Sequence, residues 1–362
     1  MQLWLTKNNF VDKKLYDGPV VATLGNFDGV HAGHRLLIAK AIESAKDKAI
    51  PSVLITFDPH PIKVLSPDSQ SRLLMTLPQK LSVLESLGLE GVWVISFSRE
   101  FSELEPGAFL DVLQKALCPV ELHIGHAFRF GWDRAGDISV LQGWGNGIGC
   151  KIHVHAYKAT DGGALSSSRI RQVLADGDVA LASELLVAPF RMTGIIVEGD
   201  RRGRSLGFPT ANLKWEQECH PASGVYVTVM SCPDHLIPSV QQVERKDHQS
   251  FFKREQSTHY QKLAGGGDPS PSYQVDLVRM QPGISKPTLG LTNVGLKPTF
   301  GGQCLTIETH LPGIDADLYG ARVELDFLHR IRGEEKFENP EVLKRKIYED
   351  IKVGTAWWQL HS

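Results

Sequence analysis

Short apolar segments alternate with helical patterns throughout the first half of the chain. Most of these segments lack alternating polar residues, which is typical of parallel strands buried on both faces. They occupy residues 20–25, 52–57, 91–97, 121–125 and 151–157. Helical patterns lie between them at 34–49, 78–88 and 106–117, the first with Ile38, Ile42 and Ala45 on one stripe. This alternation predicts an open, doubly wound α/β sheet whose ligands bind at the carboxyl ends of its strands.

From about Met192 onward the pattern changes to strand after strand, separated by glycine, proline and asparagine turns. The strand patterns occupy residues 192–200, 223–230, 272–280, 287–295, 304–311 and 321–331. They predict a small antiparallel barrel. A closing helix is predicted at 339–351, because Asn339 suits a helix cap and Pro340 suits the first helical position. We expect two domains, 1–187 and 188–362, with a polar, loop-like insertion at about 232–272 in a barrel hairpin.

Length and composition favour a cytoplasmic protein of two domains. A chain of 362 residues exceeds the size that one hydrophobic core usually serves. The formal net charge of -2 gives no electrostatic reason to expect a nucleic acid or an anionic membrane as the main partner. The five cysteines are scattered without a C-x-x-C pair, which argues against a disulfide framework or a structural zinc site. The N-terminal residues lack the apolar segment of a signal peptide, and no segment approaches membrane-spanning length.

Two histidines stand at the turn between the first of these apolar segments and the helical pattern that follows it, in GNFDGVHAGH at residues 25–34. A glycine turn at a helix N-terminus is an anion site, because unpaired amides and the helix dipole point outward. His31 and His34 add donors that can stabilise the charge developing on a phosphate, and Gly33 lets the backbone approach a nucleotide. The alternative is that the two histidines only cap a helix.

A second polar motif, LSSSRIRQVLADGD, lies at residues 165–178. Ser167 and Ser168 can donate hydroxyl groups at a helix start, and Arg169 is suited to phosphate oxygens. Taken alone, the same letters describe a serine-capped helix with surface arginines. Its meaning therefore depends on the histidine motif earlier in the same predicted domain.

Together, G-x-F-D-G-x-H-x-G-H and L-S-S-S-R-I-R resemble the nucleotidyltransferase domain of bacterial FAD synthetases, Rossmann-like members of the H-x-G-H superfamily. Leu165 and Ser168 replace the family's usual isoleucine and threonine. The resemblance implies transfer of AMP from ATP to FMN, with release of pyrophosphate and with His31 and His34 at the reacting phosphates. The residues it implies for ATP binding are Gly25, Phe27, Asp28, His31, His34, Ser167, Ser168 and Arg169. The matching segment TFDPHP implies that Pro59, His60 and Pro61 lie near the flavin.

One loop departs from this family's pattern. The family usually has G-x-D-F or G-x-N-F after the predicted strand at 121–125, whereas this chain has Gly125-His126-Ala127-Phe128. Ala127 cannot supply the carboxylate or amide that normally takes part in the site. His126 is a candidate substitute, and a weakened adenylyl transfer is the alternative.

The most specific stretch of the chain is GDRRGRSLGFPTANL at residues 199–213. A glycine-rich loop can wrap an anion, and an arginine offers a planar fork to phosphate. The residues suited to these two tasks are Gly199, Gly203, Gly207 and Arg204. Thr210 and Asn212 place two uncharged oxygens at like-facing positions, which fits a Mg²⁺ ion shared with substrate phosphates.

This stretch resembles the riboflavin kinase motif G-x-x-x-G-R-x-L-G-F-P-T-A-N nearly letter for letter. Further matches follow in order at 224–226, 293–300, 308–310, 317–320 and 327–337. The resemblance implies that Glu308 of the E-x-H element is the general base for the ribityl 5'-hydroxyl, which attacks the γ-phosphate of ATP. Arg332 is a candidate residue of the flavin site. The likeness runs from about Leu15 to Asp350, in the order of the bifunctional riboflavin kinase/FAD synthetases of bacteria.

Three hypotheses follow from these motifs. The first is a bifunctional enzyme that uses ATP and Mg²⁺ to convert riboflavin to FMN in the barrel and FMN to FAD in the α/β domain. The second is a monofunctional riboflavin kinase whose first domain is impaired by Ala127. The third is a regulatory protein that binds flavin or nucleotide without turnover, against which the retained His31, His34, Arg169 and Glu308 argue. The sequence leaves the oligomeric state open.

Overall fold

The computed structural model describes residues 1–6, 14–156, 164–199, 203, 206–232, 286–299, 302–314 and 316–361. Arg204, most of the predicted insertion and the strand predicted at 272–280 lie outside these residues. Among the described residues, the chain divides into a first compact unit that ends at Ser167 and a second that begins at Ser168. Each unit is described by itself below.

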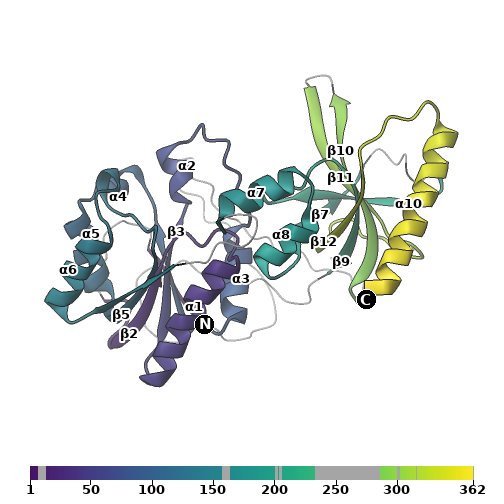
Figure 1. Cartoon of the computed structure of the whole chain (residues 1–362). Helices are drawn as coiled ribbons and strands as arrows, with labels where there is room; N and C mark the ends of the chain where they lie inside the picture. Colours follow the sequence, from purple (N-terminus) through teal and green to yellow (C-terminus); the bar gives the residue numbers. More distant parts are fainter. Residues whose placement is uncertain are drawn as a thin grey trace. The chain divides into compact units, whose positions relative to one another are not determined.

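The first unit is built on a six-stranded parallel sheet with the order β1-β4-β3-β2-β5-β6 (Figure 1). The strands are β1 (Gln2–Thr6), β2 (Pro19–Leu24), β3 (Ser52–Asp58), β4 (Gly91–Ser96), β5 (Cys118–Gly125) and β6 (Lys151–His155). The helices are α1 (Ala32–Asp47), α2 (Pro61–Leu65), α3 (Leu77–Ser86), α4 (Arg99–Ser102), α5 (Pro106–Ala116) and α6 (Ile138–Ile148), with a 3-10 turn at Trp132–Arg134. The predicted α/β sheet is confirmed, and the edge strand β1 is an addition to it.

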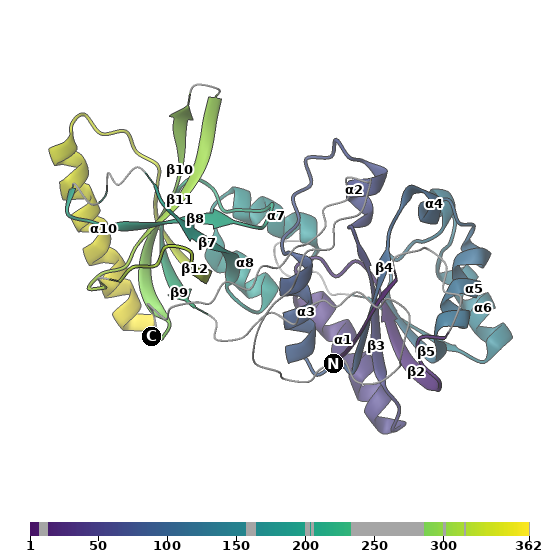
Figure 2. The same ribbon diagram turned by 180° about the vertical axis from the view of Figure 1, so that it is seen from behind.

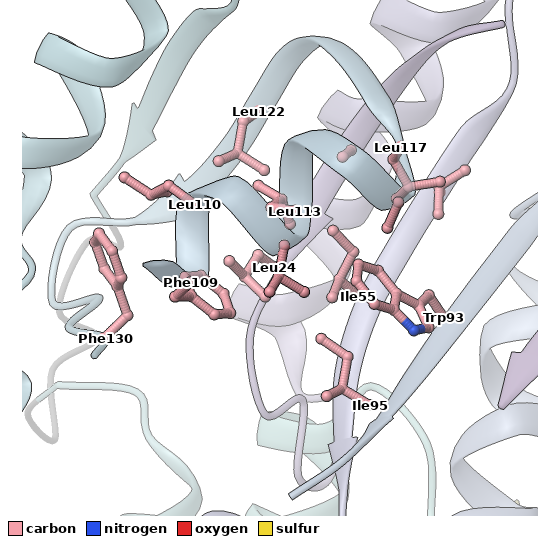
Figure 3. Close-up of a cluster of buried hydrophobic side chains, with 14 of the residues drawn as sticks. Leu24, Ile55, Trp93, Ile95, Phe109, Leu110, Leu113, Leu117, Leu122 and Phe130 are labelled. Carbon is pink, nitrogen blue, oxygen red and sulfur yellow. The ribbon is translucent and has the colours of Figure 1, made fainter. Parts of the chain in front are cut away.

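Helices cover both faces of this sheet, α1 and α3 one face and α5 and α6 the other (Figure 2). In Figure 3, side chains of the central strands lie against α5, whose Phe109 and Leu113 fill the layer between helix and sheet. Ile55 of β3 faces this layer, whereas its neighbour Leu54 faces α1 and α3. Because successive residues point to opposite faces, a strand covered on both sides is apolar at most of its positions. This is why the apolar segments of the sequence do not alternate.

The second unit contains a closed antiparallel barrel with the order β10-β11-β8-β7-β12-β9. Two helices precede the barrel, α7 (Ser167–Ala175) and α8 (Val179–Leu186). The strands are β7 (Phe190–Val197), β8 (Thr210–Trp215), β9 (Gly224–Ser231), β10 (Thr288–Thr299), β11 (Gly302–His310) and β12 (Arg322–Gly333). The predicted barrel is confirmed.

The helix α10 (Pro340–His361) packs along the barrel against β9, β10 and β12 (Figure 1). Asn339 caps it as predicted, because its Oδ1 accepts a hydrogen bond of 3.0 Å from the Val342 amide. The helix continues well beyond the predicted end at residue 351. Among the described residues, none of the helices combines the length and the apolar character that crossing a bilayer requires.

Candidate active sites

The loop with the histidine motif joins the carboxyl end of β2 to the N-terminus of α1. Three of its residues have positive φ: Phe27 at 50°, Gly29 at 85° and Val30 at 39°. Glycine adopts such angles freely, whereas Phe27 and Val30 do so at a cost in conformational energy. Both side chains are buried, at 1% and 0% exposure, so packing in the core holds the loop in this conformation.

Polar contacts from distant parts of the first unit hold the same loop. The Asn26 carbonyl accepts a hydrogen bond of 2.8 Å from Lys80 Nζ. Asp28 Oδ1 accepts one of 3.0 Å from the Leu74 amide, and the Asp28 carbonyl accepts one of 2.8 Å from the Ser167 hydroxyl. The loop therefore has a fixed shape, which is what a binding loop at a helix N-terminus requires.

Lys80 was not among the residues that the sequence singled out, although α3 itself was predicted. Its side chain is only 6% exposed, and its Nζ also donates to Thr56 Oγ1 at 3.4 Å. Burial lowers the pKa of Lys80, and the nearby Asp28 and Asp58 oppose this shift. Lys80 lies on the buried face of α3 with Leu81 and Leu84. Because lysine is rarely buried without a polar partner, its position on this face was the signal in the sequence that could have identified it.

Lys80→Met tests whether this contact positions the loop. Loss of a buried, charged hydrogen-bond donor should lower the free energy of unfolding of the first unit by about 1.5–3 kcal/mol. We expect FAD formation to fall with it, and riboflavin phosphorylation to stay unchanged. The measurements are urea unfolding and chromatographic assays of both products. Lys40→Met is the matched control, because Lys40 forms an exposed ion pair with Glu43 that contributes little stability. Equal effects of the two substitutions would contradict a positioning role.

His31 and His34 stack on each other at the start of α1. Their ring centroids are 3.6 Å apart with an interplanar angle of 15°, and the edge of Phe27 meets His34 at 5.2 Å. His31 is the N-cap of α1, because its Nδ1 accepts a hydrogen bond of 3.3 Å from the His34 amide. Its proton is therefore carried on Nε2, which remains a donor. The buried Nδ1 of His34 has no hydrogen-bond partner among the described residues. Helix capping and a phosphate-binding role are compatible here.

Both imidazoles are neutral at pH 7. Burial lowers the pKa of His31 to about 4. Burial lowers the pKa of His34 well below its ordinary value, and the neighbouring His31 and Lys80 act in the same direction. An anionic phosphate beside the rings would raise both pKa values, because a nearby negative charge favours the protonated form.

These shifts predict an acid-sensitive first unit. Below about pH 6.5 the unfolded chain binds a proton at His31 that the folded chain excludes down to about pH 4. The contribution of His31 to the free energy of unfolding should therefore be constant above about pH 6.5. Between there and pH 4 it should fall by about 3 kcal/mol. Urea unfolding at a series of pH values measures it. His31→Asn keeps an N-cap acceptor and should show a shallower slope. An unchanged slope would show that His31 is not the titrating group.

The remaining predicted residues of the adenylyl-transfer motifs occupy several places. Gly25 follows β2 directly, and a Cβ there would lie 3.3 Å from the Phe27 ring. Pro59 and His60 follow the neighbouring strand β3, and His60 Nδ1 caps α2 by accepting from the Ile62 amide at 3.1 Å. Pro61 is the first residue of α2, and Ser168 and Arg169 lie in the first turn of α7. Ser168 and Arg169 belong to the second unit, whereas Ser167 belongs to the first.

Ala127 lies in an exposed turn after β5. The His126 amide donates a hydrogen bond of 3.0 Å to the His155 carbonyl, and the Phe128 amide donates one of 3.0 Å to the Gly125 carbonyl. The turn is therefore well formed without the carboxylate or amide that the family usually has at position 127.

In the barrel, Glu308 faces the two predicted Mg²⁺ ligands from the neighbouring strand. Glu308 of β11 pairs in register with Asn212 of β8, and His310 pairs with Thr210. Thr210 Oγ1 lies 3.5 Å from Glu308 Oε2. The structure thus brings together a hydroxyl, an amide and a carboxylate, a set of oxygen donors that suits Mg²⁺.

Glu308 also forms an ion pair with Lys297 of β10, which the sequence did not single out. The side chain of Lys297 is 33% exposed and that of Glu308 is 18% exposed, so the pair borders solvent. Lys297 stands inside the NVGLKPTF segment that carried the resemblance, but nothing in that segment indicated its partner. The pairing depends on the register of β10 with β11, which only the fold supplies.

Two glycines of the segment at 199–213, Gly199 and Gly203, permit close packing around β8. A Cβ at Gly199 would clash with the Asn212 amide, and a Cβ at Gly203 would clash with the Phe208 carbonyl. Gly207 has a φ of 91°, which L-residues rarely adopt. These contacts place Gly199 beside Asn212 and Gly203 beside Thr210.

Arg332 makes a two-pronged ion pair with Asp350 of α10, with Nη2 and Oδ2 2.7 Å apart and Nε and Oδ1 3.0 Å apart. Both side chains are largely buried, at 14% and 7% exposure. The pair fastens α10 to β12. The role of Arg332 in flavin binding stays a prediction.

Comparisons with known proteins agree with both sets of motifs. Residues 13–169 match the family model described as FAD synthetase, and residues 186–358 match that described as riboflavin kinase. The bifunctional riboflavin kinase/FMN adenylyltransferase of Escherichia coli K12 is 32% identical over 331 residues, which cover 91% of this chain and 90% of that protein. The protein of the same name from Bacillus subtilis is 30% identical and covers 91% of this chain and 90% of its own length.

A solved structure, described as a macrolide-efflux protein from Streptococcus pneumoniae, matches with a TM-score of 0.77 at 24% identity. It covers 99% of this chain and 100% of its own, and at this identity the likeness shows the fold alone. The identity to the curated relatives and the two family models together decide the assignment. The chain belongs to the bifunctional riboflavin kinase/FMN adenylyltransferase family.

Proposed function

We infer that the chain phosphorylates riboflavin with ATP to give FMN, and transfers AMP from a second ATP to FMN to give FAD and pyrophosphate. The observation that carries this inference is the match to both family models, in order along the chain. The alignment with the Escherichia coli relative, at 32% identity, also covers 91% of this chain. Both reactions are ascribed to one chain, the kinase to the barrel and the adenylyltransferase to the α/β sheet.

In the adenylyltransferase, an oxygen of the FMN phosphate attacks the α-phosphorus of ATP and pyrophosphate leaves. His31 and His34 stabilise charge on the ATP phosphates by donating hydrogen bonds, His31 through its Nε2 hydrogen. The fixed loop presents its amides at the N-terminus of α1, where an anion is favoured. The proposed ATP ligands are Gly25, Phe27, Asp28, Ser167, Ser168 and Arg169, and the proposed flavin neighbours are Pro59, His60 and Pro61.

In the kinase, Glu308 accepts the proton of the ribityl 5'-hydroxyl as that oxygen attacks the γ-phosphorus of ATP. Lys297 holds the Glu308 carboxylate in place through their ion pair. Gly199, Gly203, Gly207 and Arg204 form the proposed phosphate loop. Mg²⁺ would be held by Thr210 and Asn212, and when bound it neutralises charge on the ATP phosphates.

We propose a domain boundary at residue 187, where α8 has ended and β7 has not begun, although the compact units divide earlier, between Ser167 and Ser168. We also place both reactions in the cytoplasm. Cys118, Cys150 and Cys304 are free thiols, which suits a reducing compartment.

The test is to incubate the purified protein with riboflavin, ATP and Mg²⁺ and to separate the flavins by chromatography. We expect FMN to appear first and FAD to follow. Accumulation of FMN with no FAD, even from supplied FMN, would select a monofunctional kinase impaired at Ala127. No conversion of either flavin would favour a binding protein and refute the enzymatic assignment.

A further inference from the structure

A second cluster of histidines lies on β5 and β6, and none of its members has a role in the reactions above. Glu121 and His123 of β5 are 6% and 3% exposed, and His153 of β6 pairs with His123 in the parallel register. The neighbouring strand β2 places the buried side chain of Val21 in an apolar cluster with Ala41 and Ala45 of α1. A buried carboxylate and imidazole in such a layer are unfavourable unless their charge and hydrogen-bonding capacity are satisfied.

One polar atom of each of the three side chains lies close to those of the other two. His153 Nε2 lies 3.3 Å from Glu121 Oε2, and His123 Nε2 lies 3.6 Å from the same oxygen. All three atoms lie within 4.8 Å of one another. In a tetrahedral site with bonds of about 2.0–2.2 Å, ligand atoms are separated by about 3.3–3.6 Å. The two measured separations have this size.

The polar neighbour that the structure gives to both imidazole nitrogens is the Glu121 carboxylate. Both His123 Nε2 and His153 Nε2 are buried and lack a hydrogen-bond partner in the described part of the chain. The other nitrogen of His123 lies 3.0 Å from His155 Nε2, which fixes the ring, and the Ser44 hydroxyl donates to Glu121 Oε2. Outer contacts of this kind orient the ligands of metal sites.

We propose that Glu121, His123 and His153 bind one divalent transition-metal ion of the zinc type. Two imidazoles and one carboxylate favour such an ion over Mg²⁺, which prefers oxygen donors alone. The fourth position is left for water. No cysteine takes part, so the cysteine spacing in the sequence carried no sign of this site. The ion would join the edge strand β6 to β5 and, through Ser44, to α1.

Lys48 is the local competitor for the carboxylate. Its Nζ lies 3.0 Å from Glu121 Oε1, the oxygen that does not face the imidazoles. The lysine side chain is 40% exposed at the end of α1 and can move into solvent. The positive charge of Lys48 weakens cation binding, so removal of this charge should strengthen the binding of the ion.

Zinc uptake by the metal-free, full-length protein tests the proposal. Calorimetric titration with ZnCl₂ in excess Mg²⁺, without ATP or flavin, should show one tight site per chain. Co²⁺ in place of Zn²⁺ should give the visible absorption of a four-coordinate site. His153→Ala and Glu121→Gln should each weaken zinc binding by at least about 100-fold, Ser44→Ala by about 10- to 100-fold, and Lys48→Gln should tighten it. His153 is partly exposed and Gln matches Glu in shape, so both ligand variants should fold; their thermal unfolding without metal checks this.

Three results would overturn the proposal. The first is a wild-type protein that binds Zn²⁺ no better than the Glu121→Gln and His153→Ala variants. The second is wild-type affinity in either of these two variants when it is folded. The third is an unchanged affinity in Lys48→Gln, which would place the ion away from Glu121. His361→Ala, which removes an exposed histidine of α10, should leave the single site intact and so controls for surface binding.

Discussion

Replacing Glu308 with Gln is expected to slow riboflavin phosphorylation by about 10²–10⁴-fold, the usual contribution of a positioned general base. Gln keeps the size of the side chain, and its amide oxygen can still lie near Thr210 Oγ1. An amide cannot accept the proton of the ribityl hydroxyl at neutral pH. FAD formation from supplied FMN should be unchanged, because it takes place in the other unit.

The measurement is product formation from riboflavin and, separately, from FMN, with ATP and Mg²⁺ in both. Glu324→Gln is the matched control, because Glu324 lies on β12 in a partly exposed ion pair with Arg191. This control should retain both activities. Riboflavin phosphorylation by Glu308→Gln within tenfold of the wild type would remove Glu308 from the role of base.

His34→Ala should give the opposite result, with FAD formation reduced by about 10²–10³-fold and riboflavin phosphorylation retained. Removal of one donor to a developing oxyanion has an effect of this size in other enzymes. The substitution also removes the ring that stacks on His31 at 3.6 Å, so the orientation of His31 is lost with it.

Thermal unfolding of His34→Ala shows whether the first unit remains folded, and a folded variant with normal FAD synthesis would exclude His34 from catalysis. The Glu308 and His34 variants also control for each other. If either one abolished both activities, the assignment of the two reactions to separate sites would be wrong.

Local sequence patterns were sufficient to predict most of the fold, and their failures have physical causes. The apolar segments became β2 to β6 because strands covered on both faces are apolar at most of their positions. The end of α10 was placed too early, at residue 351 instead of His361. In the structure Gly354 lies inside the helix, where a Cβ would clash with Leu291. Glycine is needed there for close packing of α10 on the barrel.

The residues of the candidate sites also fall into two groups, those that the sequence singled out and those that it missed. Motif spacing was enough to single out residues whose partners are nearby in the sequence, such as His31, which caps α1 by accepting from the His34 amide. Lys80 and Lys297 were missed because each meets its partner through tertiary structure, Lys80 at the Asn26 carbonyl and Lys297 at Glu308. Single-sequence patterns do not contain such long-range pairings, which depend on the packing of α3 and on the register of β10.

The pairing of β12 has a consequence for synthesis of the chain on the ribosome. This strand closes the barrel by pairing with β7 on one side and β9 on the other, and β8 to β11 separate it from β7 in the sequence. The closed barrel therefore cannot exist until nearly the whole chain has been translated. The parallel sheet is complete once β6 has emerged, much earlier. A message interrupted before β12 would leave a nascent chain with a finished sheet and no barrel, and hence a product that depends on FMN made elsewhere.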